Sequence, residues 1–152
     1  MADIKYTDVL EEDILDALVL AKQFHKEVNK AGYPTGFDNT KVMELIATAV
    51  GSESYKAFFI VVDGEKVGFF LGCLHEPMFS SELFATEMFW WMEKSHRGTR
   101  AGIGAIKVFE DWAISHGVTQ INVSDLQGLK SLEKLYNKFG YKLSEITYRK
   151  EL

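Results

Sequence analysis

The chain has 152 residues, of which 47% are hydrophobic and 26% are charged, and this balance excludes a disordered protein. No apolar run reaches the roughly 18 residues that a membrane-spanning helix needs. The polar start does not resemble a signal peptide, and a single cysteine, Cys73, excludes an internal disulfide. The net charge of -5 argues against general affinity for nucleic acid and favours encounter with a cationic substrate such as an amine. We therefore expect a cytoplasmic globular protein that binds neither nucleic acid nor membranes.

The first part of the chain predicts one short strand and two helices. We find no repeat, low-complexity tract or linker and expect one domain over residues 1–152. Residues 4–6 can form a strand, after which residues 7–8 offer side-chain acceptors for the start of a helix. Apolar residues then recur at steps of three and four as far as Val28, which predicts an amphipathic helix. Asp38 can cap a second, shorter helix.

The middle of the chain predicts three strands. Residues 56–62 and 66–74 are rich in Phe, Val and Ile, and they flank Asp63 and Gly64. An Asp-Gly pair between two such runs indicates a hairpin, because a type I′ turn needs positive φ at both central positions. Residues 84–93 read as a third long strand. Strict alternation divides that strand into two faces, with Glu87, Phe89 and Trp91 on one and Met88, Trp90 and Met92 on the other.

The last part of the chain predicts two helices and two strands. Residues 102–116 are expected as a helix, residues 120–123 as a short strand and residues 129–139 as a last helix. Residues 141–148 can form a closing strand. The resulting order of elements predicts a mixed α/β domain with a central antiparallel hairpin and a β-α-β unit in its second half.

One segment combines the residue types that an anion-binding site needs. Residues 93–104 read Glu-Lys-Ser-His-Arg-Gly-Thr-Arg-Ala-Gly-Ile-Gly, between a predicted strand and a predicted helix. The first amides of a helix have no partner within it and carry the positive end of its dipole, while glycines admit a phosphate and arginines add charge. The segment can therefore bind a phosphate, or it can be a basic turn without a ligand. It is not a P-loop, since no Gly-Lys-Ser/Thr follows, and its spacing does not fit a dinucleotide-binding fingerprint.

Two runs of residues resemble the motifs of a known family. The run Phe-Trp-Trp-Met-Glu-Lys-Ser-His-Arg-Gly at residues 89–98, followed by Gly102, Ile103 and Gly104, resembles the acetyl-CoA motif of the GNAT superfamily of N-acetyltransferases. In that family an apolar strand runs into Arg/Gln-x-x-Gly-x-Gly/Ala at the start of a helix. The run Leu-Tyr-Asn-Lys-Phe-Gly-Tyr at residues 135–141 resembles the family's C-terminal signature, and the order of elements agrees over nearly the whole chain.

The resemblance implies an α/β (α+β) fold in which a mixed, mostly antiparallel central sheet has helices on both faces. It also implies an N-acetyltransferase that moves the acetyl group of acetyl-CoA, as co-substrate, onto a primary amine of a small molecule or peptide, with no metal. The alternative is a catalytically inactive GNAT-fold protein that acts as an acyl-CoA-binding or protein-interaction module. A third reading is a small acidic interaction protein whose Arg/Gly turn is incidental.

The implied coenzyme site begins at the end of the third long strand. There the main chain would pair with the pantetheine arm and polarise the acetyl carbonyl. The loop that follows departs from the usual pattern, because three residues separate Gly98 from Gly102, so either Arg97 or Arg100 is expected near the pyrophosphate. Leu129 stands where the family frequently has an Asn. The implied coenzyme-binding residues are Trp91, Met92, Arg97, Gly98, Thr99, Arg100, Ala101, Gly102, Ile103 and Gly104.

Two residues are candidates for proton transfer. An alkyl amine with a pKa of about 10.4 arrives protonated, so a base assists its attack on a thioester. Glu87 is the candidate base, since apolar neighbours raise the proton affinity of a carboxylate; otherwise it is a solvent-facing strand residue. The resemblance implies that Tyr136 lies near the coenzyme sulfur and protonates the departing thiolate; otherwise it is a helix tyrosine packed on the sheet. His75 is a reserve base.

The acceptor amine is not specified by the sequence. In this family it is recognised mainly by the two loops that correspond here to residues 29–39 and 76–82. Both stretches are partly apolar and aromatic, which permits a pocket for a peptide terminus, a small amine or an antibiotic. The same aromatic residues can also serve a homodimer.

Overall fold

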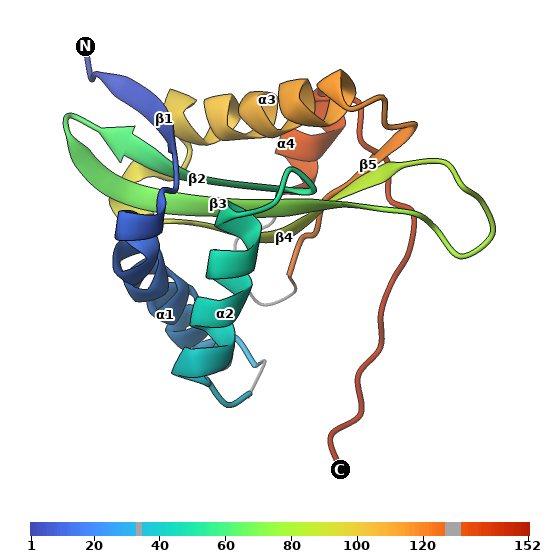
Figure 1. Cartoon of the computed structure of the whole chain (residues 1–152), viewed down its shortest axis with the longest axis horizontal. Helices are drawn as coiled ribbons and strands as arrows, with labels where there is room; N and C mark the ends of the chain where they lie inside the picture. Colours follow the sequence, from blue (N-terminus) through green and yellow to red (C-terminus); the bar gives the residue numbers. More distant parts are fainter. Residues whose placement is uncertain (33–34, 127–131) are drawn as a thin grey trace.

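Five strands form one mixed sheet in which spatial order follows chain order (Figure 1). The computed structural model describes residues 1–32, 35–126 and 132–152. The strands are β1 (Ile4–Asp8), β2 (Tyr55–Val62), β3 (Glu65–His75), β4 (Phe84–Met92) and β5 (Gln120–Asn122). The neighbours from β1 to β4 are antiparallel, whereas β4 and β5 are parallel.

Helices cover both faces of this sheet, as the resemblance implied (Figure 1). α1 (Ile14–Lys30) and α2 (Asn39–Val50) lie on one face, and α3 (Arg100–Ser115) and α4 (Glu133–Lys138) lie on the other. Two single 3-10 turns, η1 (Glu11–Asp13) and η2 (Lys94–His96), precede α1 and α3. The predicted fold class, a mixed and mostly antiparallel sheet between helices, is therefore confirmed.

The sheet separates two hydrophobic cores. Alternate residues of β2 and β3 enter opposite cores, so Phe58 and Phe70 stack on the α3 side while Phe59 and Phe69 pack on the side of α1 and α2. Because both faces are covered, these strands read as continuous apolar runs. On the α3 side the ring of Phe109 is fully buried against Gly72, where any side chain would collide with it.

The predicted hairpin is confirmed, but the predicted faces of β4 are wrong in one place. Asp63 and Gly64 have φ angles of 50° and 85°, as the turn between β2 and β3 requires. In the pairing of β3 with β4, Leu71 lies opposite Phe89 and Gly72 opposite Glu87, so Met88 is an extra residue. This β-bulge reverses the alternation. Glu87 therefore points to the α3 and α4 side, not to the side of Phe89 and Trp91.

Two helix starts differ from the prediction. Strand β1 continues through Asp8 because its residues pair with β2, so α1 begins at Ile14 after a 3-10 turn and not at residues 7–8. α3 begins at Arg100, two residues earlier than predicted, because the Thr99 side chain caps it. The last helix spans Glu133–Lys138, and Leu129 lies outside the described residues.

The predicted closing strand is absent. Residues 141–152 form no helix or strand, and residues 142–152 are all exposed. This segment leaves α4 and runs away from the sheet toward the C-terminal end of the chain (Figure 1). Its β-forming sequence finds no neighbouring strand within the described part of the chain, and a strand forms only where its main chain is paired.

Candidate active site

The sheet opens where β4 and β5 separate. Only residues 84–86 of β4 pair with Gln120–Asn122 of β5, while Glu87 and residues 89–92 pair with β3 alone. The second edge of β4 is thus open over residues 87–92 in the described part of the chain. A strand edge without a partner presents main-chain donors and acceptors to a ligand.

The register of β4 decides which main-chain groups face this open edge. The amide of Glu93 donates to the Val67 carbonyl at 2.8 Å. Since main-chain direction alternates along a strand, Trp91 also faces β3, and Trp90 and Met92 face the open edge. Of the two strand residues expected at the coenzyme, Met92 therefore faces the opening and Trp91 does not. Trp90 is the residue that sequence reasoning missed, because register is not visible in the sequence alone.

The start of α3 lies beside this edge. The Thr99 hydroxyl accepts from the Ala101 amide at 3.3 Å and donates to the His96 carbonyl at 2.6 Å, which fixes the turn between η2 and α3. Gly98 takes a positive φ of 75° in this turn, with open space where a side chain would stand. The amides of Arg100 and Gly102 belong to the first helical turn and have no helical partner. The Arg100 side chain is exposed, so this helix start places a cation at the surface, while Gly102 itself is buried.

Arg97 is held by other parts of the protein. Its guanidinium makes two bonds of 2.6 Å to the Glu27 carboxylate on α1, and its Nε donates to the Met92 carbonyl at 2.8 Å. The indole N–H of Trp91 donates to the same carboxylate at 2.8 Å. Arg97 keeps the pKa of Glu27 below its ordinary value, against the effect of partial burial. The network therefore fastens α1 to the end of β4 and to the turn before α3.

Gly104 has a structural reason to lack a side chain. Any Cβ at this position would collide with the ring of Tyr6, whose hydroxyl donates to the Ala101 carbonyl at 2.7 Å. Tyr6 stands on β1, so it ties the edge of the sheet to the first turn of α3. Sequence reasoning missed this residue, because nothing near it in the chain indicates its contact with α3.

The two residues expected to transfer protons meet at Ser124, just after β5. The Glu87 carboxylate accepts from the Ser124 amide at 3.1 Å, and the Tyr136 hydroxyl donates to the Ser124 carbonyl at 2.8 Å. Both side chains are buried, with exposed fractions of 9% and 7%. Glu87 is therefore not the solvent-facing residue of the alternative reading. The bulge at Met88 turns it toward α4, and this turn is what brings it to Tyr136.

Burial sets the protonation of this pair. It raises the pKa of Glu87 to about 7, although the Ser124 amide acts in the opposite direction. Burial also raises the pKa of Tyr136 above its ordinary value, and the charges of Glu87 and Asp125 add to the effect. A carboxyl with a pKa near neutrality can take up and release a proton under physiological conditions.

Several solved structures share this architecture. No protein-family model matches the sequence, and no curated protein matches it with significance. The aminoglycoside N-acetyltransferase AAC(6')-Iy, solved with a bisubstrate analogue of CoA and acetylneamine, superposes with a TM-score of 0.78 at 15% identity, covering 99% of each chain. A ribosomal-protein-alanine N-acetyltransferase from Brucella melitensis biovar Abortus 2308 superposes with a TM-score of 0.69 at 15% identity, covering 100% of each chain. The chain has the GNAT fold.

This fold is not confined to proteins described as acetyltransferases. A transcriptional regulator from Bacillus halodurans C-125 superposes with a TM-score of 0.78 at 12% identity, covering 99% of this chain and 100% of its own. At such identities the likeness to GNAT structures establishes the architecture alone. The chemistry has to be argued from the residues of this chain.

The GNAT fold does not bring the two expected acceptor loops together here. Figure 1 shows the loop between β3 and β4, which includes residues 76–82, beyond one end of the sheet and well apart from the end of α1. Residues 33–34 of the other expected loop lie outside the described residues. Met78 and Phe79 in this loop are 88% and 95% exposed. His75, the reserve base, is exposed at the same end and bonds to the Thr86 hydroxyl at 2.7 Å.

The described residues contain neither a metal-ligand cluster nor a membrane-spanning helix. Within residues 1–32, 35–126 and 132–152, no three His, Cys, Asp or Glu side chains gather as a metal site would require. In the same part of the chain, none of the helices has the length and apolar character to cross a bilayer.

Proposed function

We propose that this protein is an N-acetyltransferase that moves an acetyl group from acetyl-CoA onto a primary amine of a small molecule or peptide. The observation that carries the proposal is the open edge of β4 between two features. At one end lies the amide-rich start of α3, and at the other end lie Glu87 and Tyr136, joined through Ser124. An anion site and a proton-transfer pair at the two ends of one strand edge suit a long thioester that carries a phosphate group.

Residues 97–104 have different roles in the proposed anion site. The amides of Arg100 and Gly102 and the exposed guanidinium of Arg100 are the groups that would hold the pyrophosphate. Thr99 and Ala101 shape the helix start through their hydrogen bond, Gly98 leaves it open, and Ile103 and Gly104 continue the first turn. Since Glu27 already binds the guanidinium of Arg97, we assign Arg97 to holding the loop, which leaves Arg100 as the phosphate ligand.

The strand edge suits the pantetheine arm. The main-chain groups of Trp90 and Met92 face the open edge of β4. The Met92 carbonyl already accepts a hydrogen bond from the Nε of Arg97. The indole nitrogen of Trp90 is buried without a partner, and its ring lies beside Gly102 at the start of α3. A buried donor without an acceptor is costly, so this indole favours an acceptor group on the ligand side of β4.

The proton-transfer pair suits the acyl transfer itself. Acetyl-CoA supplies an acetyl thioester, which a neutral amine attacks. Glu87, with a pKa of about 7, is mostly ionised slightly above neutral pH and can accept a proton from the ammonium form. Tyr136 keeps its proton because burial raises its pKa, so it can donate to a departing thiolate in place of the Ser124 carbonyl.

Ligand binding and turnover test the proposal separately. Thermal stability is measured with acetyl-CoA and with coenzyme A, and ATP serves as a control for any phosphate-bearing nucleotide. We expect both coenzymes to raise the Tm and ATP to leave it nearly unchanged, because a ligand bound only by the folded state stabilises that state. Release of free thiol is then followed over a panel of amines. An unchanged Tm at saturating acetyl-CoA would contradict the proposal.

The second candidate is a GNAT-fold protein that binds acyl-CoA, or a protein, without catalysis. The burial of Glu87 and Tyr136 favours this alternative, since the tyrosine hydroxyl is already bonded within the chain. It predicts that coenzyme A raises the Tm while no amine accelerates thiol release. The Tm shift and the thiol assay together therefore separate the two functions.

A further inference from the structure

One carboxylate on α1 is bonded to two parts of the proposed coenzyme segment, residues 90–104. Glu27 accepts from the two Nη atoms of Arg97 at 2.6 Å each and from the indole N–H of Trp91 at 2.8 Å. These partners are 70 and 64 residues away from it in the chain. α1 and α3 cover opposite faces of the sheet, so the contact joins the two layers where β4 ends (Figure 1). Glu27 is thus the point at which α1 meets the coenzyme segment.

The pair of Glu27 and Arg97 is held in one geometry. Their side chains are 17% and 26% exposed, so solvent screens the pair only in part. Each guanidinium nitrogen of Arg97 has its own acceptor, because the two Nη atoms donate to Glu27 and Nε donates to the Met92 carbonyl. The hydrogen bonds from Arg97 hold the pKa of Glu27 below its ordinary value, so the carboxylate is ionised at neutral pH. A planar guanidinium with three fixed acceptors has little freedom to move.

The position of Arg97 relates the two ends of the proposed coenzyme site. Its side chain reaches back to the Met92 carbonyl on the open edge of β4, while its main chain leads through Gly98 into the start of α3. Because the guanidinium lies against that carbonyl, it occupies the end of the open edge. The main chain of Trp90 and the amide of Met92 are then the groups that a pantetheine arm would meet first. Arg97 therefore fixes where the open edge ends and how far it lies from the helix start.

We propose that Glu27 is a positioning residue for the coenzyme, because it holds Arg97 where the open edge of β4 and the start of α3 keep the spacing that one coenzyme molecule spans. The inference rests on the coenzyme-binding part of the proposed function and not on catalysis. Glu27 acts through Arg97 and does not touch the ligand. A long ligand held at two separate points binds less tightly when those points move, because part of its binding free energy then goes into ordering them.

The affinity for coenzyme A tests this role. Isothermal titration calorimetry, well below the Tm of each variant, gives the Kd of wild type and of Glu27→Gln. We expect the substitution to raise the Kd about tenfold, within the usual range of coupling between two positions in a protein. Asp13→Asn is the matched control, because Asp13 is a carboxylate of similar exposure whose partners are Lys66 and the Leu10 amide. It should lower the Tm of the free protein and leave the Kd unchanged.

A second variant keeps the test informative if Glu27→Gln does not fold. Arg97→Lys keeps the positive charge but lacks the planar fork that reaches Glu27 and the Met92 carbonyl together. We expect it to raise the Kd for coenzyme A as well, with a smaller loss of stability. If Glu27 acts through Arg97, the double variant binds coenzyme A no more weakly than the weaker single variant.

The outcomes separate this inference from the proposed function. A wild type that does not bind coenzyme A would contradict the proposed function, and this inference with it. A wild type that binds, together with a folded Glu27→Gln of lower Tm and equal Kd, would overturn only the positioning role. Additive losses of affinity in the double variant would overturn it too, because Glu27 would then act without Arg97.

Discussion

The part of the molecule from β1 to α3 and the part that follows differ in how completely they are closed. The first part has four antiparallel strands whose main chains pair with one another. Helices cover both faces of these strands and complete two hydrophobic cores. Among its described residues, the second part contributes one three-residue strand, a short helix and a C-terminal segment that joins no strand. The proposed ligand edge of β4 lies where the closed part meets the open one. We therefore expect most of the stability to reside in the first part and the proposed ligand-binding groups to lie at the junction.

The largest effect on stability is expected in the closed part. Phe109 is fully buried, with its ring 4.8 Å from that of Phe70. Phe109→Ala removes that packing and leaves a cavity over Gly72, so we expect a loss of about 3–5 kcal/mol in the free energy of unfolding. Ile114→Ala on the same helix, at a largely exposed site, should change it by less than about 1 kcal/mol. Urea unfolding measures both, and similar losses would contradict the contrast between core and surface of α3.

The second effect concerns Glu87 at the junction. Its folded-state pKa of about 7 lies above the usual value of 4.5, so the folded state binds the proton more tightly than the unfolded state does. Stability then falls as pH rises between these two values and is level above them, a loss of about 3 kcal/mol. Glu87→Gln removes this dependence, so the variant should gain on the wild type between about pH 5 and pH 8.

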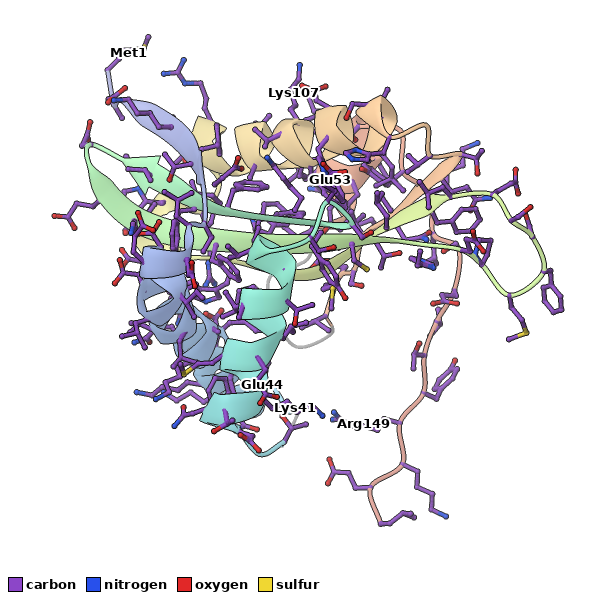
Figure 2. The ribbon with its side chains drawn as sticks, viewed as in Figure 1. Met1, Lys41, Glu44, Glu53, Lys107 and Arg149 are labelled. Atoms are coloured by element: carbon purple, nitrogen blue, oxygen red, sulfur yellow. The ribbon has the colours of Figure 1, made fainter. Side chains whose placement is uncertain are left out.

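The control for this pH effect is Glu44→Gln, at an exposed position on α2 (Figure 2). Urea unfolding at both pH values should show no change in its pH dependence relative to wild type. If Glu87 is also the base, Glu87→Gln lowers kcat by about 10²- to 10⁴-fold. A stability profile that rises with pH over this window would contradict the raised pKa, whatever the activity.

The third prediction compares Arg97 and Arg100 in their effects on stability and on coenzyme binding. Arg97→Met leaves the half-buried Glu27 carboxylate without its cation, and we expect a loss of about 2 kcal/mol in unfolding free energy. Arg100→Met, at an exposed position, should change stability by less than about 0.5 kcal/mol. It should instead reduce the Tm shift that coenzyme A produces. An unchanged ligand shift in Arg100→Met would remove Arg100 from the proposed phosphate site.

Among the substitutions that break an internal contact, the smallest stability effect is expected at Tyr136. Tyr136→Phe leaves the Ser124 carbonyl without its donor, a loss of about 1 kcal/mol. If the hydroxyl protonates the thiolate, kcat for thiol release falls by about 10²-fold or more while the KM for acetyl-CoA changes little. Tyr55→Phe serves as the matched control on β2. A variant that keeps full kcat would assign Tyr136 to packing alone.

Much of the scaffold could be predicted from local sequence. The Asp63 and Gly64 turn, the cap at Asp38 and the apolar periods of α1 and α3 depend on residues close together in the chain. The glycine- and arginine-rich loop before α3 could also be predicted, because the residues that shape a helix start are consecutive in the chain. The junction was not predictable in the same way. The bulge at Met88 depends on the register of pairing between β4 and β3, and no neighbouring residue in the sequence indicates that register shift.

Sequence alone therefore determined most of the elements, the fold class and the glycine- and arginine-rich loop, since turns, caps and periodicity act over a few residues. Only the tertiary structure decided that Arg97 binds Glu27, which is 70 residues away, and that Glu87 turns inward to meet Tyr136 at Ser124. It also decided that residues 141–148 are not a strand within this chain. These outcomes depend on which distant partner each group reaches, because a main-chain edge or a buried charge is stable only when its partner is present.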